Sequence, residues 1–206
     1  MIVCARMERK AFSAFPKSIS REEIAALPLT RYEGPVRLVS AEAELDDAVE
    51  RLRKERVLGF DTETKPSFKK GETHPVALMQ IAASDAVYII SMRRFPASRQ
   101  LGGLLADASI IKAGVDLGQD KIKLAEAGYA ELAGIADLSR IARSLEITTT
   151  GMRSLAAIIL GIRVSKGAKR SNWGARNLTP AQIAYAATDA WVSREIYLAL
   201  MRMRLV

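Results

Sequence analysis

The sequence predicts an α/β domain, a sheet with some antiparallel strands and with helices on its faces. A strand and a hairpin come early in the chain, and segments with helical and strand patterns then alternate. The length of 206 residues suits a single domain with a sizeable core. The hydrophobic content of 49% and the charged content of 26% are ordinary for a soluble globular protein.

The expected strands are short apolar runs that end at polar or turn-forming residues. Two of these runs are separated only by Ser84 and Asp85, so together they predict a hairpin. In chain order, the expected strands are residues 37–40, 57–64, 76–83, 86–92, 110–115 and 134–139.

The expected helices carry apolar residues at helical spacing, and two of them begin at a capping box. One box pairs Ser20 with Glu23; the other pairs Thr179 with Gln182, and Pro180 occupies the first position of that helix. The start of the last helix is therefore well defined. In chain order, the expected helices are residues 20–28, 41–55, 98–107, 116–128, 139–146, 152–161 and 179–204.

The segment before the first strand, residues 1–36, is polar and contains prolines, so we expect a loosely attached arm there. Cys4 is the one cysteine of the chain, which excludes an internal disulfide and a cysteine-rich zinc site. A reducing cytoplasm fits this composition best. The sequence has no apolar run of the roughly 18 residues that a membrane span needs, so we expect no membrane partner.

The net charge of +8 is concentrated in the last part of the chain. Residues 161–206 hold eight Lys and Arg against two acids, a local net charge of +6. A basic region of this kind favours a polyanionic partner. A solvated surface with chance clustering of charge is the alternative, and the charge pattern alone favours neither.

Two acids end the strand that contains the stretch FDTET. Asp61 and Glu63 are two residues apart, so they share one face of the strand at its C-terminal end, where α/β sheets carry their sites. Two carboxylates so close repel each other, so one is protonated or a cation lies between them. Hard cations such as Mg²⁺ accept carboxylate oxygens. A solvated strand end is the structural alternative.

The last helix and the helix before it add further candidates. Tyr185 and Asp189 are four residues apart and stack on one face of the last helix, although they could be a core tyrosine and an exposed acid. Asp120 lies in the first turn of the expected helix 116–128, where the helix dipole also favours an acid. Asp116 is the alternative N-cap of that helix.

In combination, these motifs resemble the DEDD superfamily of 3′–5′ exonucleases, in the subclass with a tyrosine in the last motif. FDTET is similar to the first motif, KAGVDLGQD to the second and YAATDA to the third. The resemblance extends to VALMQIA and to KRSNW followed by LTPAQIAYAATDAW, as in ribonuclease D and the Werner-syndrome exonuclease. It covers about residues 37–200, and no motif departs from the family pattern.

The resemblance implies a ribonuclease H-like fold, with a mixed five-stranded sheet flanked by helices in a single domain. It implies an arm at residues 1–36 and an exonuclease domain at residues 37–206. Two divalent metal ions, Mg²⁺ or Mn²⁺, would serve as cofactors. The implied ligands and catalytic residues are Asp61, Glu63 and Asp189 at the first metal, Asp61 also at the second, Asp120 mainly through water, and Tyr185 beside the attacking water.

A 3′ end would enter a groove above these carboxylates. Lys166, Lys169, Arg170 and Arg176 could meet phosphates, because they fall in the basic stretch RVSKGAKRSNWGARN. Trp173 could stack on a base or fasten this loop to the core. Met79 could line the groove or pack in the core, and Gln80 could line the groove beside it. His74 is expected in a surface loop, with no catalytic role.

The expected substrate is single-stranded or 3′-ended nucleic acid, cleaved to nucleoside 5′-monophosphates. DNA is favoured over RNA, because KAGV and SNW resemble the Werner-type members. A ribonuclease D-like RNA-processing enzyme and a non-catalytic nucleic-acid-binding module are the alternatives. The sequence has neither the G-x-G-x-x-G nor the G-x-x-x-x-G-K-[ST] pattern of nucleotide-binding α/β proteins.

Overall fold

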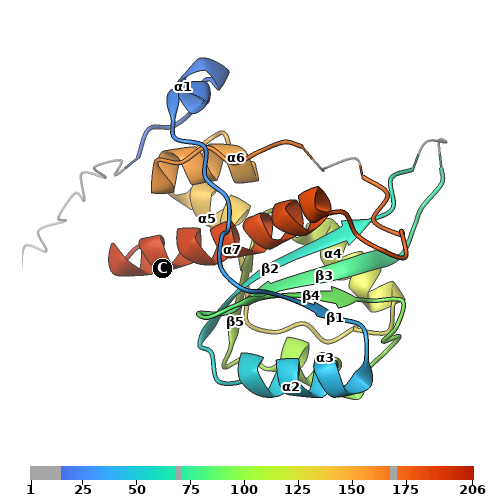
Figure 1. The fold of residues 1–206 in the computed structure, drawn as a ribbon. Helices are drawn as coiled ribbons and strands as arrows, with labels where there is room; N and C mark the ends of the chain where they lie inside the picture. The colour runs from blue at the N-terminus through green and yellow to red at the C-terminus, as the bar shows by residue number, and fades with distance from the viewer. Residues whose placement is uncertain (1–14, 68–70, 168–170) are drawn as a thin grey trace, which may run out of the picture.

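A mixed sheet of six strands lies at the centre of the described part of the molecule (Figure 1). The computed structural model describes residues 15–67, 71–167 and 171–206. Across the sheet the strand order is β1-β4-β3-β2-β5-β6. The strands are β1 (Val36–Val39), β2 (Val57–Thr64), β3 (Val76–Ala82), β4 (Val87–Ser91), β5 (Ile111–Gly114) and β6 (Ile135–Asp137).

Only β3 runs against the other strands of this sheet. It pairs antiparallel with β2 and β4, whereas β1 with β4, β2 with β5 and β5 with β6 are parallel pairs. The predicted hairpin at Ser84 and Asp85 is confirmed as the turn from β3 to β4. The mixed α/β class is confirmed, but the sheet has one strand more than the family resemblance implied.

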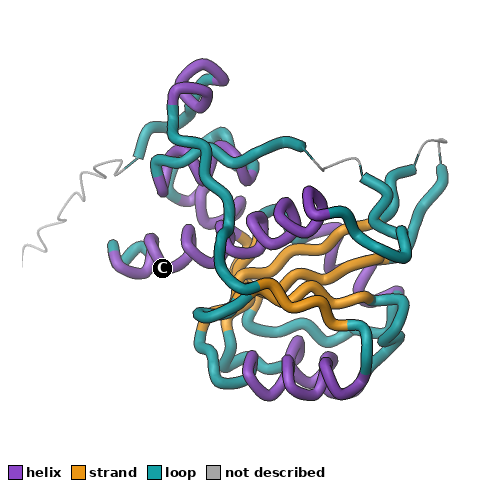
Figure 2. The backbone as a smooth tube through the Cα atoms, viewed as in Figure 1, coloured by secondary structure: helices purple, strands orange, loops and turns teal. Residues whose placement is uncertain are grey.

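Helices cover both faces of the sheet, as Figures 1 and 2 show for α7 on one side and α2 and α3 on the other. The larger core cluster packs α2, α3 and α4 against one face, through residues such as Leu52 and Phe60. The described helices are α1 (Arg21–Ala26), α2 (Glu42–Leu52), α3 (Arg99–Ala106), α4 (Gly118–Glu126), α5 (Leu138–Ser144), α6 (Met152–Leu155), the π-helical η1 (Ala156–Leu160) and α7 (Pro180–Arg202).

Both predicted capping boxes are present. At the start of α1, the Ser20 hydroxyl accepts from the Glu23 amide, and the Glu23 carboxylate accepts from the Ser20 amide. At the start of α7, Thr179 and Gln182 make the same reciprocal pair at 2.9 and 3.2 Å. Such a box defines the first residue of a helix, so the box of α7 fixes where Tyr185 and Asp189 lie along it.

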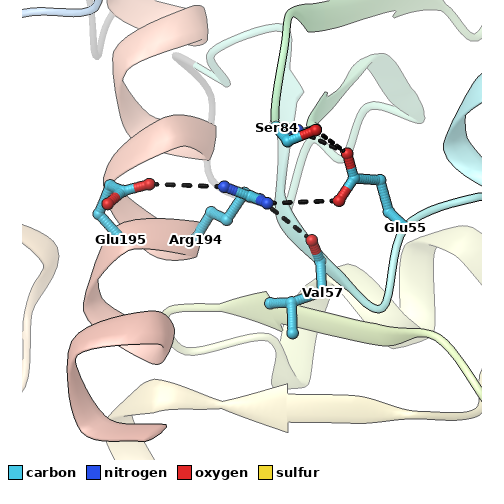
Figure 3. A network of polar contacts seen from close by, with 5 residues as sticks. All are labelled: Glu55, Val57, Ser84, Arg194 and Glu195. Carbon is cyan, nitrogen blue, oxygen red and sulfur yellow. Dashed lines mark hydrogen bonds and ion pairs between the residues drawn. The ribbon is translucent and has the colours of Figure 1, made fainter. Parts of the chain in front are cut away.

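A polar network joins the middle of α7 to the start of β2 (Figure 3). The Arg194 Nε donates to the Val57 carbonyl at 3.1 Å, and its Nη2 lies 3.3 Å from a Glu55 carboxylate oxygen. The other Glu55 oxygen accepts from the Ser84 amide and hydroxyl, and Glu195 lies 3.6 Å from Arg194 Nη1. The network holds α7 on the strand that ends in the FDTET acids.

Residues 28–32 of the arm are hydrogen-bonded to the domain, whereas a loosely attached arm was expected. The Arg163 amide donates to the Pro28 carbonyl at 2.9 Å, and the Thr30 amide donates to the Arg163 carbonyl at 2.8 Å. The Tyr32 amide donates to the Thr188 hydroxyl at 3.0 Å. Among the described residues, none of the helices is both long enough and apolar enough to cross a membrane.

Candidate active site

Three carboxylates from two elements converge above the C-terminal half of β2. Asp61 and Glu63 lie on the same face of β2 as Gly59, where an added Cβ would meet Ala190 of α7, so both point toward α7. Asp189 projects from α7 and is 8% exposed. One carboxylate oxygen from each of the three residues lies within 4.8 Å of the others. The predicted convergence of these acids is therefore present in the structure.

The electrostatics of this cluster favour a bound cation. Burial raises the pKa of Asp61 well above its usual range, and the neighbouring carboxylates of Asp189 and Glu63 raise it further. A divalent ion among the oxygens would offset both effects on the pKa, because its positive charge stabilises the ionised carboxylates. The donor set consists of oxygens, which is the ligand type that Mg²⁺ and Mn²⁺ take.

Asp120 lies beside this cluster, on the other side of β2. It occupies the first turn of α4, as predicted, and the Thr62 hydroxyl donates to its Oδ1. Burial raises the pKa of Asp120, and the hydrogen bond from Thr62 opposes that rise. Asp120 also contributes to the raised pKa of Asp61. Its carboxylate is therefore close enough to act on the site.

The alternative in which Asp116 caps α4 is wrong. Asp116 has a φ of 60°, in the left-handed region, and is exposed. The cap position belongs to Leu117, which has no side-chain oxygen to offer the helix amides. Neither acid therefore caps α4. Asp120 lies in the first turn of the helix, where the sequence predicted a site residue.

Tyr185 completes the group on α7, one helical turn before Asp189. Burial raises the pKa of Tyr185, and the charge of Asp189 and a hydrogen bond to its carboxylate add to the rise. The phenol therefore keeps its proton at neutral pH and acts as a hydrogen-bond donor. Its ring lies 6.0 Å from that of Trp173, at an interplanar angle of 38°.

Two cavities open on either side of Tyr185 and Asp189. One, of about 560 Å³, is lined by α6 and by the loop after η1, including Arg153 and Lys166. The other, of about 730 Å³, runs between the first turns of α7 and residues of the arm. Ser165 and Gly167 also line both. A cavity of about 660 Å³ near α3 shares no lining residue with them.

The structure corrects the groove positions expected for three residues. Met79 is fully buried in the core cluster on the face away from α7, so it takes the core position, one of the two that were expected for it. Gln80 is also fully buried, beside its strand partner Asp61. Trp173 is 1% exposed and packs with Leu78 of β3. A base cannot reach a side chain buried to this extent, so Trp173 fastens the loop to the core.

The basic residues differ in what the structure describes of them. Lys166 is exposed and lines the cavity beside α6, and Arg176 is exposed. Lys169 and Arg170 lie outside the described residues. His74 is half-buried in a loop, 3.3 Å from Glu72, and lines neither cavity at Asp189.

Sequence reasoning missed Thr62, Arg153 and the contribution of the arm. The position of Thr62 could have been predicted from strand alternation. A residue between two acids of one strand faces the opposite side of the sheet from them. That side is covered by the helix that carries Asp120. Arg153 and the arm residues gave no comparable signal, since their place at the site depends on tertiary packing.

A mixed sheet with clustered carboxylates and a tyrosine, at the C-terminal end of β2 and in the N-terminal half of α7, is typical of ribonuclease H-like nucleases. The chain belongs to the 3′–5′ exonuclease family, because the family model described as "3'-5' exonuclease" matches residues 36–204. The resemblance to the DEDD superfamily is thereby confirmed, and the family is one of nucleic-acid hydrolases.

Curated relatives include three exonuclease proteins. "Exonuclease 3'-5' domain-containing protein 2" of Homo sapiens is 31% identical over 207 residues, covering 92% of this chain and 32% of the relative. The "Bifunctional 3'-5' exonuclease/ATP-dependent helicase WRN" of Mus musculus is 34% identical, and its alignment covers 74% of this chain and 11% of the relative. "Ribonuclease D" of Gluconacetobacter diazotrophicus is 31% identical, and its alignment covers 80% of this chain and 42% of the relative. The chain thus spans less than half of each relative.

Among solved structures, the Nibbler EXO domain of Aedes aegypti superposes with a TM-score of 0.76. The alignment covers 85% of this chain and 94% of that domain, at 23% sequence identity. The likeness shows that the two chains share a fold.

Proposed function

We propose that the protein is a metal-dependent 3′–5′ exonuclease that removes nucleoside 5′-monophosphates from the 3′ end of nucleic acid. The observation that carries this proposal is the convergence of Asp61, Glu63 and Asp189 within 4.8 Å, in a cluster whose member Asp189 lines two cavities. Repulsion among these carboxylates favours a bound divalent cation, and the cavities leave room for a strand on each side.

Two divalent ions, Mg²⁺ or Mn²⁺, would be held by Asp61, Glu63 and Asp189, with Asp120 acting through water. When bound there, such ions supply an acidified water and stabilise charge on the attacked phosphate and the leaving oxygen. Thr62 orients the Asp120 carboxylate through its hydroxyl. Tyr185 keeps its proton in the hydrogen bond to Asp189, so its hydroxyl oxygen would orient the attacking water by accepting a hydrogen bond from it, without taking its proton.

The basic residues around the site would hold the phosphates of the strand. Lys166 lines the cavity beside α6, and Arg176 is exposed in the loop before α7. We assign the same role to Lys169 and Arg170 on the sequence pattern alone. Because phosphate contacts release counterions, replacement of Lys166 should weaken binding and reduce its dependence on salt.

DNA is the favoured substrate, on the resemblance of KAGV and SNW to the Werner-type sequences. The relative named "Ribonuclease D" supports RNA as the second candidate. The choice depends on whether the site accepts a 2′-hydroxyl next to the scissile phosphate.

The test uses one oligonucleotide sequence as DNA and as RNA, labelled at the 5′ or the 3′ end. Each is incubated with Mg²⁺, with Mn²⁺ or with EDTA. We expect a ladder from the 5′-labelled strand, immediate mononucleotide release from the 3′-labelled strand, and neither in EDTA. Asp189→Asn is the matched inactive variant. A non-catalytic binding module would instead retain the oligonucleotide in EDTA and form no product with either metal.

A further inference from the structure

The arm contributes a wall to the larger cavity beside the metal site. Leu29, Thr30, Arg31 and Glu33 line this cavity of about 730 Å³ opposite the first turns of α7. All four precede residue 36, where the match to the family model begins. The cavity reaches Tyr185 and Asp189, so it is continuous with the cluster of carboxylates.

The wall is held in place by hydrogen bonds on both sides of Arg31. A short parallel bridge joins Leu29 to Arg163, with main-chain bonds of 2.8 and 2.9 Å. On the other side, the Tyr32 amide donates to the hydroxyl of Thr188, which immediately precedes Asp189. The Tyr32 ring also lies 6.0 Å from that of Trp191. The segment is therefore part of the framework around Asp189.

The length of the cavity indicates what it holds. Its lining on α7 extends from Ala181 to Asp189, which at 1.5 Å per residue is about 12 Å. Stacked nucleotides rise by about 3.4 Å each, so this distance accommodates about three of them. An exonuclease releases one nucleotide per cleavage. A cavity longer than one nucleotide is therefore suited to the strand that remains after cleavage.

The side chains on the wall suit a nucleic acid strand. Leu29 is 62% exposed, so its apolar surface is free to pack against a base. The Arg31 side chain is 73% exposed, and its Nε lies 3.6 Å from a carboxylate oxygen of Glu33, which is itself exposed. An exposed ion pair of this kind contributes little free energy. Arg31 can consequently exchange Glu33 for a phosphate.

We propose that the arm segment Leu29–Glu33 binds the retained strand and makes the enzyme favour substrates longer than a dinucleotide. The proposal rests on the proposed function, and adds a substrate-length preference that originates outside the family domain. Leu29 packs against a base two or three positions from the 3′ end, and Arg31 binds a phosphate there. The terminal nucleotide binds in the other cavity, which is lined by Arg153 and Lys166.

The experiment measures single-nucleotide release from strands of two, four and eight nucleotides with Mn²⁺. The test variant is Leu29→Ala/Arg31→Ala, and the matched control is Leu38→Ala/Arg37→Ala, an exposed pair on β1 that lines none of the cavities. For the test variant we expect KM to rise by about tenfold for the octamer and by at most about threefold for the dimer. The kcat should stay within about twofold, because the reacting groups are not altered.

Equal increases in KM at all three lengths, or no increase, would overturn the proposal. Failure of the proposed function itself has a different signature, since the wild-type chain would then release no nucleotide from any strand. In that case, binding of a labelled octamer is measured by fluorescence anisotropy in Ca²⁺. Weaker binding by the test variant than by the control would support strand binding by Leu29–Glu33, and equal binding would overturn it. Arg31→Ala alone should also lower the salt slope of octamer binding by about 1.

Discussion

Gly59 of β2 lies directly beneath Ala190 of α7, so closely that the helix backbone rests on the strand. A Cβ atom on Gly59 would lie 1.9 Å from the Ala190 carbonyl oxygen and 2.9 Å from the Arg194 amide. Asp61 follows Gly59 by two residues on the same face, and Asp189 immediately precedes Ala190. The close approach of helix and strand therefore sets how far apart the two carboxylates lie.

Gly59→Ala is expected to move α7 away from β2 and to separate these carboxylates. Overpacking of this kind costs about 1–3 kcal/mol of unfolding free energy, and we expect nuclease activity to fall by at least about tenfold. Urea denaturation and the metal concentration for half-maximal activity measure the two effects. Gly102→Ala is the control, since a Cβ there makes only an ordinary contact of 3.8 Å with Tyr129. Full activity of Gly59→Ala would show that the site does not depend on this contact.

The sequence was sufficient to predict the strands, the hairpin and the convergence of Asp61, Glu63 and Asp189. The alternation of Asp61 and Glu63 and the capping box at Thr179 are local patterns, and each determines the direction or position of a side chain. The burial of Trp173 and the close approach at Gly59 depend on which elements pack together. No local pattern carries that information, so the groove was predicted less well than the carboxylate cluster.

Asp61→Asn is expected to stabilise the metal-free protein at neutral pH. Burial and the nearby carboxylates raise the pKa of Asp61 in the folded state, whereas the unfolded value is near 4. Between these two values the folded state binds more protons than the unfolded state, so wild-type stability falls as the pH rises. The substitution removes this loss, so we expect a higher free energy of unfolding than that of the wild type at pH 7, with a difference that shrinks as the pH falls toward 4.

Thermal denaturation in EDTA between pH 4 and pH 8 measures this gain. The exposed Asp85→Asn serves as the control and should follow the wild-type profile. Added Mn²⁺ should raise the wild-type Tm and raise that of Asp61→Asn much less, while activity of this variant falls roughly a thousandfold, about 4 kcal/mol of transition-state stabilisation. Equal stabilisation of both chains by Mn²⁺ would contradict a metal site at Asp61.

Thr62→Val is expected to lower activity although Thr62 is not one of the acids of the motif FDTET. The variant keeps the shape of the side chain but removes the hydroxyl that donates to Asp120. A hydrogen bond to a charged group contributes about 1.5–3 kcal/mol, so we expect a loss of about 10- to 100-fold in kcat. Thr62→Ser keeps the hydroxyl and should restore most of the activity. If Val and Ser lower the rate equally, packing rather than the hydrogen bond is responsible.

Tyr185→Phe is expected to reduce kcat by about 10- to 100-fold, less than loss of an acid ligand. Its raised pKa keeps the phenol protonated far above neutral pH, so Tyr185 has no titration between pH 6 and pH 9. The pH–rate profile of the variant should accordingly keep the wild-type shape over this range and lie below it at every pH. Tyr197→Phe, at a tyrosine that lines neither cavity at Asp189, is the control and should match the wild type. A profile that loses one of its limbs in Tyr185→Phe would mean that the tyrosine exchanges a proton during the reaction, because an oriented but non-titrating phenol changes the rate without changing its pH dependence.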